Sequence, residues 1–148
     1  MKKLILAAAL LVSIAAVASG SPAEVNEKVL KAFKETFANA KDVVWNEYEN
    51  YYQANFKLDE IQVRAQYDEN GSLLRTMRYY GEKFLLPNIV SRLKKKYGSK
   101  EVFGVTEITT DNEVNFVVTL RDEKNWYIIK SDAYANFEQT DKFKRADN

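Results

Sequence analysis

One apolar pattern occurs twice in this chain, at a spacing of about 60 residues. The matched positions include Val29 with Ile89, Phe33 with Leu93, Phe37 with Tyr97, Val43 with Phe103 and Phe56 with Phe116. Agreement over so many positions predicts an internal duplication, with one unit over about 22–80 and a second over about 84–144. Neither unit is large enough to bury an apolar face well by itself, so we expect the two to share one core.

Each unit is predicted to open with a helix. Ser21-Pro22-Ala23-Glu24 has the pattern of a capping box with proline at the first helical position. Apolar residues at a spacing of four then predict an amphipathic helix over about 22–38. In the second unit, Leu86-Pro87 indicates a helix start and Gly98 its end.

Alternating segments follow the first helix. Tyr52–Leu58 and Val63–Tyr67 alternate apolar with polar residues, which is typical of strands that bury one side. Asp68-Glu69-Asn70-Gly71 predicts a tight hairpin turn, because Asn-Gly tolerates positive φ angles. The expected fold class is α+β. It consists of two tandem helix-plus-antiparallel-strands repeats that share one core. Their strands are expected to form one sheet or two abutting sheets, with the helices packed on one face of the sheet.

The first residues of the chain predict export. Met1-Lys2-Lys3 is a short positive segment, residues 4–17 are almost entirely apolar, and Ala16-Val17-Ala18 has the small-x-small pattern of a cleavage site. The apolar run is shorter than the roughly 20 residues that a membrane-spanning helix needs. We therefore expect a signal peptide over 1–18, cleavage before Ser19, no membrane insertion after cleavage, and a periplasmic or secreted location.

The order of motifs in the remaining chain resembles the PepSY-like family of exported bacterial proteins. The segments that carry the resemblance are Ala40-Lys41-Asp42-Val43-Val44-Trp45, Tyr52-Gln53-Ala54-Asn55-Phe56, residues 65–74, and Leu86-Pro87-Asn88-Ile89-Val90. The resemblance covers essentially all of the chain after residue 18 and implies a fold similar to that of the β-lactamase inhibitor protein (BLIP). It supplies no catalytic or ligand-binding residues. Asp132-Ala133-Tyr134-Ala135-Asn136 departs from the pattern because it lacks a turn glycine, so a looser or differently shaped turn is expected there.

The composition leaves few catalytic chemistries open. The chain contains neither histidine nor cysteine, which excludes Ser-His triads, thiol nucleophiles and imidazole or thiolate metal sites. Acidic pairs occur at Asp59-Glu60, Asp68-Glu69 and Asp122-Glu123, all in predicted turns where solvated acids are usual. We expect no catalytic residues, no metal site and no cofactor. A hydrolase that uses two facing carboxylates remains the alternative enzyme reading.

Charge also argues against nucleic acid as a partner. Removing Lys2 and Lys3 with the signal peptide leaves 20 of the 22 basic residues against 21 acidic ones, so no basic excess remains.

Adjacent aromatic residues are the candidate binding residues. Strand alternation places neighbouring residues on opposite faces, so one member of each pair is expected to point away from the helices. The candidates are Tyr51, Tyr79, Tyr80, Trp126 and Tyr127. Tyr51 is the expected outward member of its pair, because Tyr52 shares a face with Ala54 and Phe56. Tyrosine and tryptophan are favoured anchors of protein interfaces, although they also cover sheets as cross-strand pairs.

These observations predict a non-enzymatic binding module, inhibitor-like or regulatory toward another envelope or secreted protein. Besides the carboxylate-dependent hydrolase, a ligand-carrying or structural envelope protein is the remaining alternative.

Overall fold

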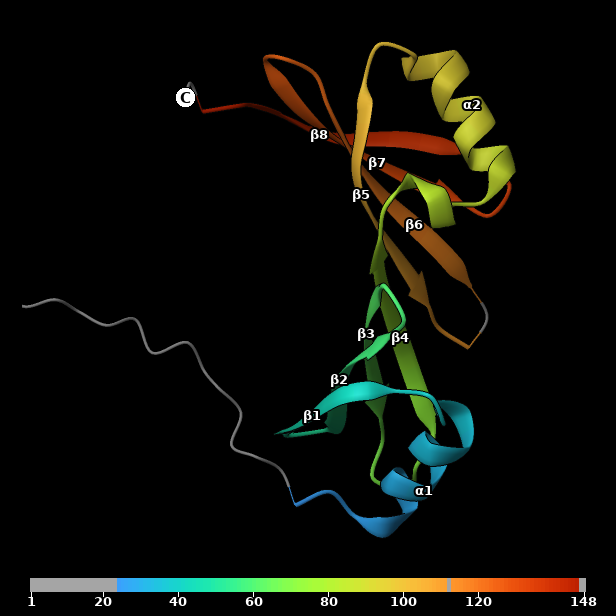
Figure 1. Cartoon of the computed structure of the whole chain (residues 1–148), viewed down its shortest axis with the longest axis vertical. Helices are drawn as coiled ribbons and strands as arrows, with labels where there is room; N and C mark the ends of the chain where they lie inside the picture. The colour runs from blue at the N-terminus through green and yellow to red at the C-terminus, as the bar shows by residue number, and fades with distance from the viewer. Residues whose placement is uncertain (1–23, 112, 147–148) are drawn as a thin grey trace, which may run out of the picture.

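The chain forms one eight-stranded antiparallel sheet and two short α-helices (Figure 1). The computed structural model describes residues 24–111 and 113–146, so the predicted signal peptide and its cleavage site lie outside the described residues. The elements are α1 (Glu27–Thr36), β1 (Lys41–Tyr48), β2 (Tyr51–Leu58), β3 (Ile61–Tyr67), β4 (Leu73–Tyr80), the 3-10 helix η1 (Glu82–Phe84), α2 (Pro87–Tyr97), β5 (Glu101–Thr109), β6 (Val114–Arg121), β7 (Asn125–Asp132) and β8 (Phe137–Lys144).

The predicted fold class is wrong. The strands lie in the sheet in the order β1 to β8, so all eight belong to one continuous sheet and the protein is mostly β. The two helices are short, with 10 and 11 residues, and lie one at the start and one in the middle of the described chain. An α+β protein of two tandem helix-plus-strand repeats is therefore not what forms. The physical reason is that each half contributes four strands but only one helix, of 10 or 11 residues, so the strands dominate the structure.

The helix starts test the capping predictions. Residues 24–26 are not helical, and α1 begins at Glu27 with Asn26 as its cap, whose side-chain oxygen accepts a hydrogen bond from the Val29 amide at 3.0 Å. The helix predicted over about 22–38 is therefore shorter within the described residues, from Glu27 to Thr36; Ser21 and Pro22 lie outside the described residues. The second helix runs from Pro87 to Tyr97 with Gly98 after its end, which confirms both of its predicted boundaries.

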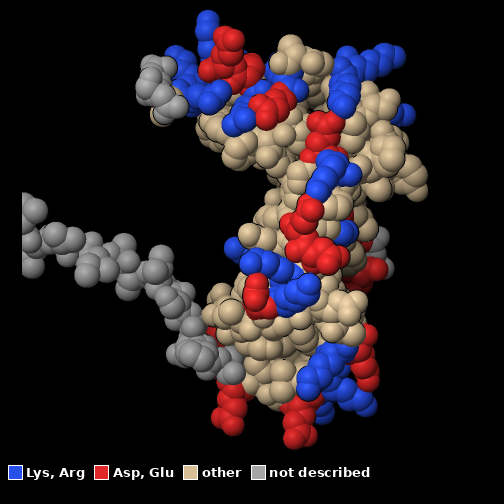
Figure 2. Space-filling view, in the orientation of Figure 1, with Lys and Arg blue, Asp and Glu red and all other residues tan. Residues whose placement is uncertain are grey.

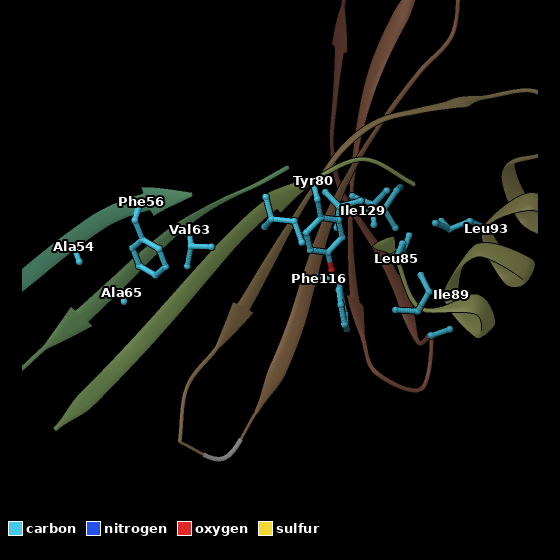
Figure 3. Packing of buried hydrophobic residues seen from close by; sticks show 14 of the residues in the cluster. Ala54, Phe56, Val63, Ala65, Tyr80, Leu85, Ile89, Leu93, Phe116 and Ile129 are labelled. Atoms are coloured by element: carbon cyan, nitrogen blue, oxygen red, sulfur yellow. The ribbon is translucent and has the colours of Figure 1, made fainter. Parts of the chain in front are cut away.

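Both helices cover the same face of the sheet, which we call the inner face. The ring of Phe33 on α1 lies 5.1 Å from that of Phe56 on β2, in an edge-on arrangement. On α2, Ile89 and Leu93 are buried and point toward Leu85 and Ile129 (Figure 3). The opposite side, which carries no helix, is called the outer face.

Two aspartates close the β3–β4 and β7–β8 turns in the same way. The Oδ1 atom of Asp68 accepts the amides of Asn70 and Ser72 at 2.9 and 2.8 Å. Oδ1 of Asp132 likewise accepts the amides of Tyr134 and Asn136 at 2.9 and 3.0 Å. The second turn is therefore as well ordered by hydrogen bonds as the first, although it lacks glycine: Ala135 adopts the positive φ of 61°.

The middle of the sheet is narrow and charged. Figure 2 shows that the molecule is narrower at mid-height than at either end, and that positively and negatively charged side chains gather there. β4 pairs with β5 only between Thr76–Thr109 and Tyr80–Val105. On the inner face of this junction, Glu107 accepts hydrogen bonds from Arg78 at 3.0 Å and from the Tyr80 hydroxyl at 2.5 Å. Burial, and then the neighbouring carboxylate, raise the pKa of Tyr80 above its ordinary value.

A candidate binding face on the sheet

The five aromatic residues singled out by the sequence divide between the two faces. Tyr80 and Tyr127 lie on the inner face and are each only 8% exposed. Tyr51, Tyr79 and Trp126 lie on the outer face, where each is half-buried. The buried pair is out of reach of a partner in the folded protein, and the outward three are spread over β2, β4 and β7. Whether the outward rings bind anything stays a prediction.

A ladder of side-chain amides runs across the outer face of β1, β2 and β3. Gln66 donates to Gln53 at 3.0 Å, Gln53 to Asn55 at 3.1 Å, and Asn55 to Asn46 at 2.9 Å. Gln53 is 8% exposed, so the ladder supplies the hydrogen bonds that a buried amide requires. The ladder fixes its side chains and makes this part of the face polar and rigid.

Tyrosines meet at one end of the ladder. The rings of Tyr48 and Tyr51 stack with centroids 4.6 Å apart, at the two sides of the β1–β2 turn. A hollow of about 410 Å³ lies beside them, and its other lining residues include Glu47, Glu49 and Glu69. This end of the sheet is therefore aromatic and acidic.

The middle of the outer face holds a second hollow, of about 270 Å³. Its lining includes Val44, Asn55, Lys57, Arg64 and Tyr79. The guanidinium carbon of Arg64 lies 5.2 Å from the centroid of the Tyr79 ring, which is the geometry of a cation–π contact. This part of the face is therefore aromatic and basic.

The other end of the outer face carries three aromatic rings. Phe103 contacts Trp126 edge-on at 4.7 Å between centroids, and Phe143 is the cross-strand neighbour of Trp126. Phe103 and Phe143 are 56% and 55% exposed, which is unusual for phenylalanine. Arg121 lies 5.0 Å from the Phe103 centroid, so the apolar rings have a cation beside them.

Sequence reasoning missed Phe103, Phe143 and Arg64 as surface residues of interest. Phe103 lies at an irregularity in β5 between Val102 and Gly104, where simple alternation assigns the wrong face. One signal was available for it. The duplicated pattern matched Phe103 with Val43, and the structure leaves both exposed.

A salt bridge holds Arg121 at this end of the face. Its Nε and Nη2 atoms donate to the two carboxylate oxygens of Glu101 at 2.8 and 2.9 Å. This bidentate hydrogen bonding lowers the pKa of Glu101 below its ordinary value. A hollow of about 620 Å³ lies beside the pair, and Asp122, Lys124 and Arg145 also line it.

The acidic pairs considered for catalysis lie in three separate turns. Asp122 accepts a hydrogen bond from the Tyr127 hydroxyl at 2.7 Å and two more from backbone amides of its turn. The Tyr127 hydrogen bond is the main cause that lowers the pKa of Asp122 to about 2. Amides of its own turn likewise lower the pKa of Asp68. These two carboxylates hold turns together, and their lowered pKa values make them poor general acids at neutral pH.

Two negative findings apply to the described part of the chain alone. Over residues 24–111 and 113–146, no three acidic side chains gather as a metal site would require. Within the same residues, neither helix has the length and apolar character needed to cross a bilayer.

Comparison with solved structures supports the fold. A BLIP-like protein from Bacteroides fragilis superimposes with a TM-score of 0.66 at 20% identity, covering 83% of this chain and 89% of that one. A DUF2874 family protein from Bacteroides uniformis superimposes with a TM-score of 0.63 at 17% identity, covering 80% of this chain and 88% of that one. A "putative periplasmic" protein from Bacteroides eggerthii superimposes with a TM-score of 0.64 at 12% identity, covering 82% of this chain and 90% of that one.

The BLIP-like fold implied by the sequence resemblance is therefore confirmed at the level of fold. No protein-family model matches the chain, and no curated protein matches it. Membership of the PepSY-like family accordingly stays a prediction.

Proposed function

We propose that this protein is an exported, non-enzymatic binding module whose outer face holds another envelope or secreted protein. The observation that carries the proposal is the set of aromatic side chains left on a helix-free sheet face. Phe103 and Phe143 are more than half exposed there, and Tyr48 is 40% exposed. Exposed aromatic clusters on a soluble domain usually mark an interaction site.

The rigidity of the face supports the same role. The amide ladder and the Arg121–Glu101 bridge fix polar side chains between and beside the aromatic groups. A pre-ordered surface loses less conformational entropy when a partner binds, which favours affinity. One of the proteins that share this fold is described as BLIP-like, which agrees with a binding role. An inhibitor-like or regulatory action on the partner is part of the proposal.

The proposed location is the periplasm or the cell exterior. The signal peptide predicted over residues 1–18 supports it, as does the likeness to the Bacteroides eggerthii protein.

The non-enzymatic part of the proposal rests on the acids and the composition. The acidic pairs occupy separate turns, and the chain has no histidine or cysteine to act as base or nucleophile. A glycosidase-type mechanism needs two carboxyl groups facing each other within roughly 5–10 Å.

The test is a pull-down from an envelope extract with the mature domain, followed by mass spectrometry. Tyr51→Glu should weaken capture of a specific partner while leaving the melting temperature nearly unchanged, because Tyr51 lies outward on β2. The control is Tyr134→Glu, at a tyrosine that is 80% exposed but lies in the β7–β8 turn. Equal capture by wild type and by Tyr51→Glu would contradict the proposal.

A further inference from the structure

Arg64 differs from Arg78 and Arg121, the two arginines that form salt bridges within the described residues. Arg78 and Arg121 each have a carboxylate partner, Glu107 and Glu101 respectively. Within residues 24–111 and 113–146, Arg64 takes part in none of the ion pairs, and its side chain is exposed on β3. Its described contact is the face of the Tyr79 ring, at 5.2 Å.

The hollow around Arg64 carries an uncompensated positive charge. Lys57 and Asp42 also line it, but they form a salt bridge with each other at 3.0 Å and so neutralise one another. Arg64 is the remaining charged group of the lining. A hollow of about 270 Å³ is large enough for a short side chain, since a water molecule takes about 30 Å³ in the liquid.

The outward positions of the three strands around Arg64 also lack acids. The outward positions of β2, β3 and β4 follow from the strand pairing, and none of them is acidic: they are Tyr51, Gln53, Asn55, Lys57, Gln62, Arg64, Gln66, Arg75, Met77 and Tyr79. An unpaired guanidinium in the middle of such a surface is complementary to a negatively charged group on a partner.

We propose that this hollow receives a carboxylate, from an aspartate or glutamate side chain of the partner protein. This inference rests on the proposed function and names the chemistry of the group that the outer face recognises. The cation–π contact with Tyr79 leaves the guanidinium N–H groups without a carboxylate partner, and these groups match a carboxylate in a two-point hydrogen bond. The ring also restricts the arginine side chain before binding.

The direct test uses a defined probe. Two blocked pentapeptides, one with a single central glutamate among alanines and one with glutamine instead, are titrated into the isotope-labelled mature domain by NMR. The glutamate peptide should shift the Arg64 side-chain Nε–H resonance and the ring signals of Tyr79. Its affinity should fall by about fivefold or more with Arg64→Gln and with the glutamine peptide.

Two variants keep the test specific. Arg75→Gln is the matched control, because Arg75 is also an exposed arginine that points to the outer face, on β4. It should leave peptide affinity close to that of the wild type, and Arg64→Lys should retain part of it. Arg64→Gln and Arg75→Gln should both have the melting temperature of the wild type, since neither substitution removes a buried contact. Absence of shifts at Arg64 and Tyr79, or equal binding by Arg64→Gln, would overturn the inference.

The same variants separate this inference from the proposed function. A captured partner that is lost with Tyr51→Glu but retained with Arg64→Gln refutes the carboxylate hollow and leaves the binding face intact. Capture that is unchanged by Tyr51→Glu refutes the proposed function itself.

Discussion

Replacing Glu107 with alanine should destabilise the fold at the junction between β4 and β5. The Glu107 side chain is 14% exposed, and its two oxygens accept hydrogen bonds from Arg78 at 3.0 Å and Tyr80 at 2.5 Å. A hydrogen bond to a buried charged group contributes about 1.5–3 kcal/mol. The Arg78 side chain is 39% exposed, so its share is reduced to about 1 kcal/mol or less by solvent screening. Together these predict a loss of about 2–4 kcal/mol in the free energy of unfolding.

Urea unfolding of Glu107→Ala, Tyr80→Phe and the double variant measures this directly. The two groups are in contact, so a coupling energy of about 1–2 kcal/mol is expected from the cycle. Glu138→Ala serves as the control: Glu138 is exposed on β8, and its loss should change stability by no more than about 0.5 kcal/mol. A loss below about 1 kcal/mol for Glu107→Ala, or a coupling near zero, would show that the junction does not depend on this carboxylate.

Three further perturbations test the core, a turn and the pH response. Phe56→Ala should cost about 3–5 kcal/mol in urea unfolding, because Phe56 is 4% exposed; a much smaller loss would contradict its place in the core. Gly71→Ala should cost about 1–3 kcal/mol, since φ is +87° and a Cβ atom would lie 2.9 Å from the Lys28 carbonyl oxygen; unchanged stability would disprove this close approach. Burial raises the pKa of Tyr67 from 10.0 to about 12, so its contribution to stability is complete below pH 10 and lost as the pH rises toward 12. Tyr67→Phe should flatten that alkaline loss in thermal melts, whereas Tyr134→Phe, at an exposed tyrosine, should not.

Local features of the fold could be predicted from the sequence because their causes are local. The helix from Pro87 to Gly98 has its start and stop residues within the helix itself. The turn at Asp68–Gly71 follows from residues that close it by their own hydrogen bonds and from a glycine with positive φ. The outward direction of Tyr51 follows from strand alternation alone.

The start of α1 shows how a local rule fails. Ser21-Pro22-Ala23-Glu24 matched a capping box, but the cap is Asn26. Besides accepting the Val29 amide, Asn26 donates its side-chain amide to the Glu69 carbonyl oxygen at 2.9 Å. That second contact joins the helix to a turn 43 residues away, which no pattern near the helix could indicate.

The continuous sheet and the candidate site depended on long-range contacts in the same way. Nothing in the residues of β4 or β5 indicates that these strands pair across an intervening helix, so the sequence left open whether the strands form one sheet or two. In the sequence, Arg64 occupies an ordinary polar position of an alternating strand. It stands out only because its neighbours across β2 and β4 are Asn55 and Met77, neither of which is acidic.

The pairing of β4 with β5 also has a consequence for the order of folding events. Every other neighbouring pair in the sheet joins strands connected by a turn, so those hairpins close short loops. Tyr80 and Val105 are 25 positions apart and Thr76 and Thr109 are 33 apart, so this pairing must close a longer loop at a greater entropic cost. We expect the junction to form after the rate-limiting step. Glu107→Ala should then chiefly accelerate unfolding and leave the refolding rate almost unchanged in stopped-flow measurements. A refolding rate that falls in proportion to the lost stability would place the junction in the nucleus instead.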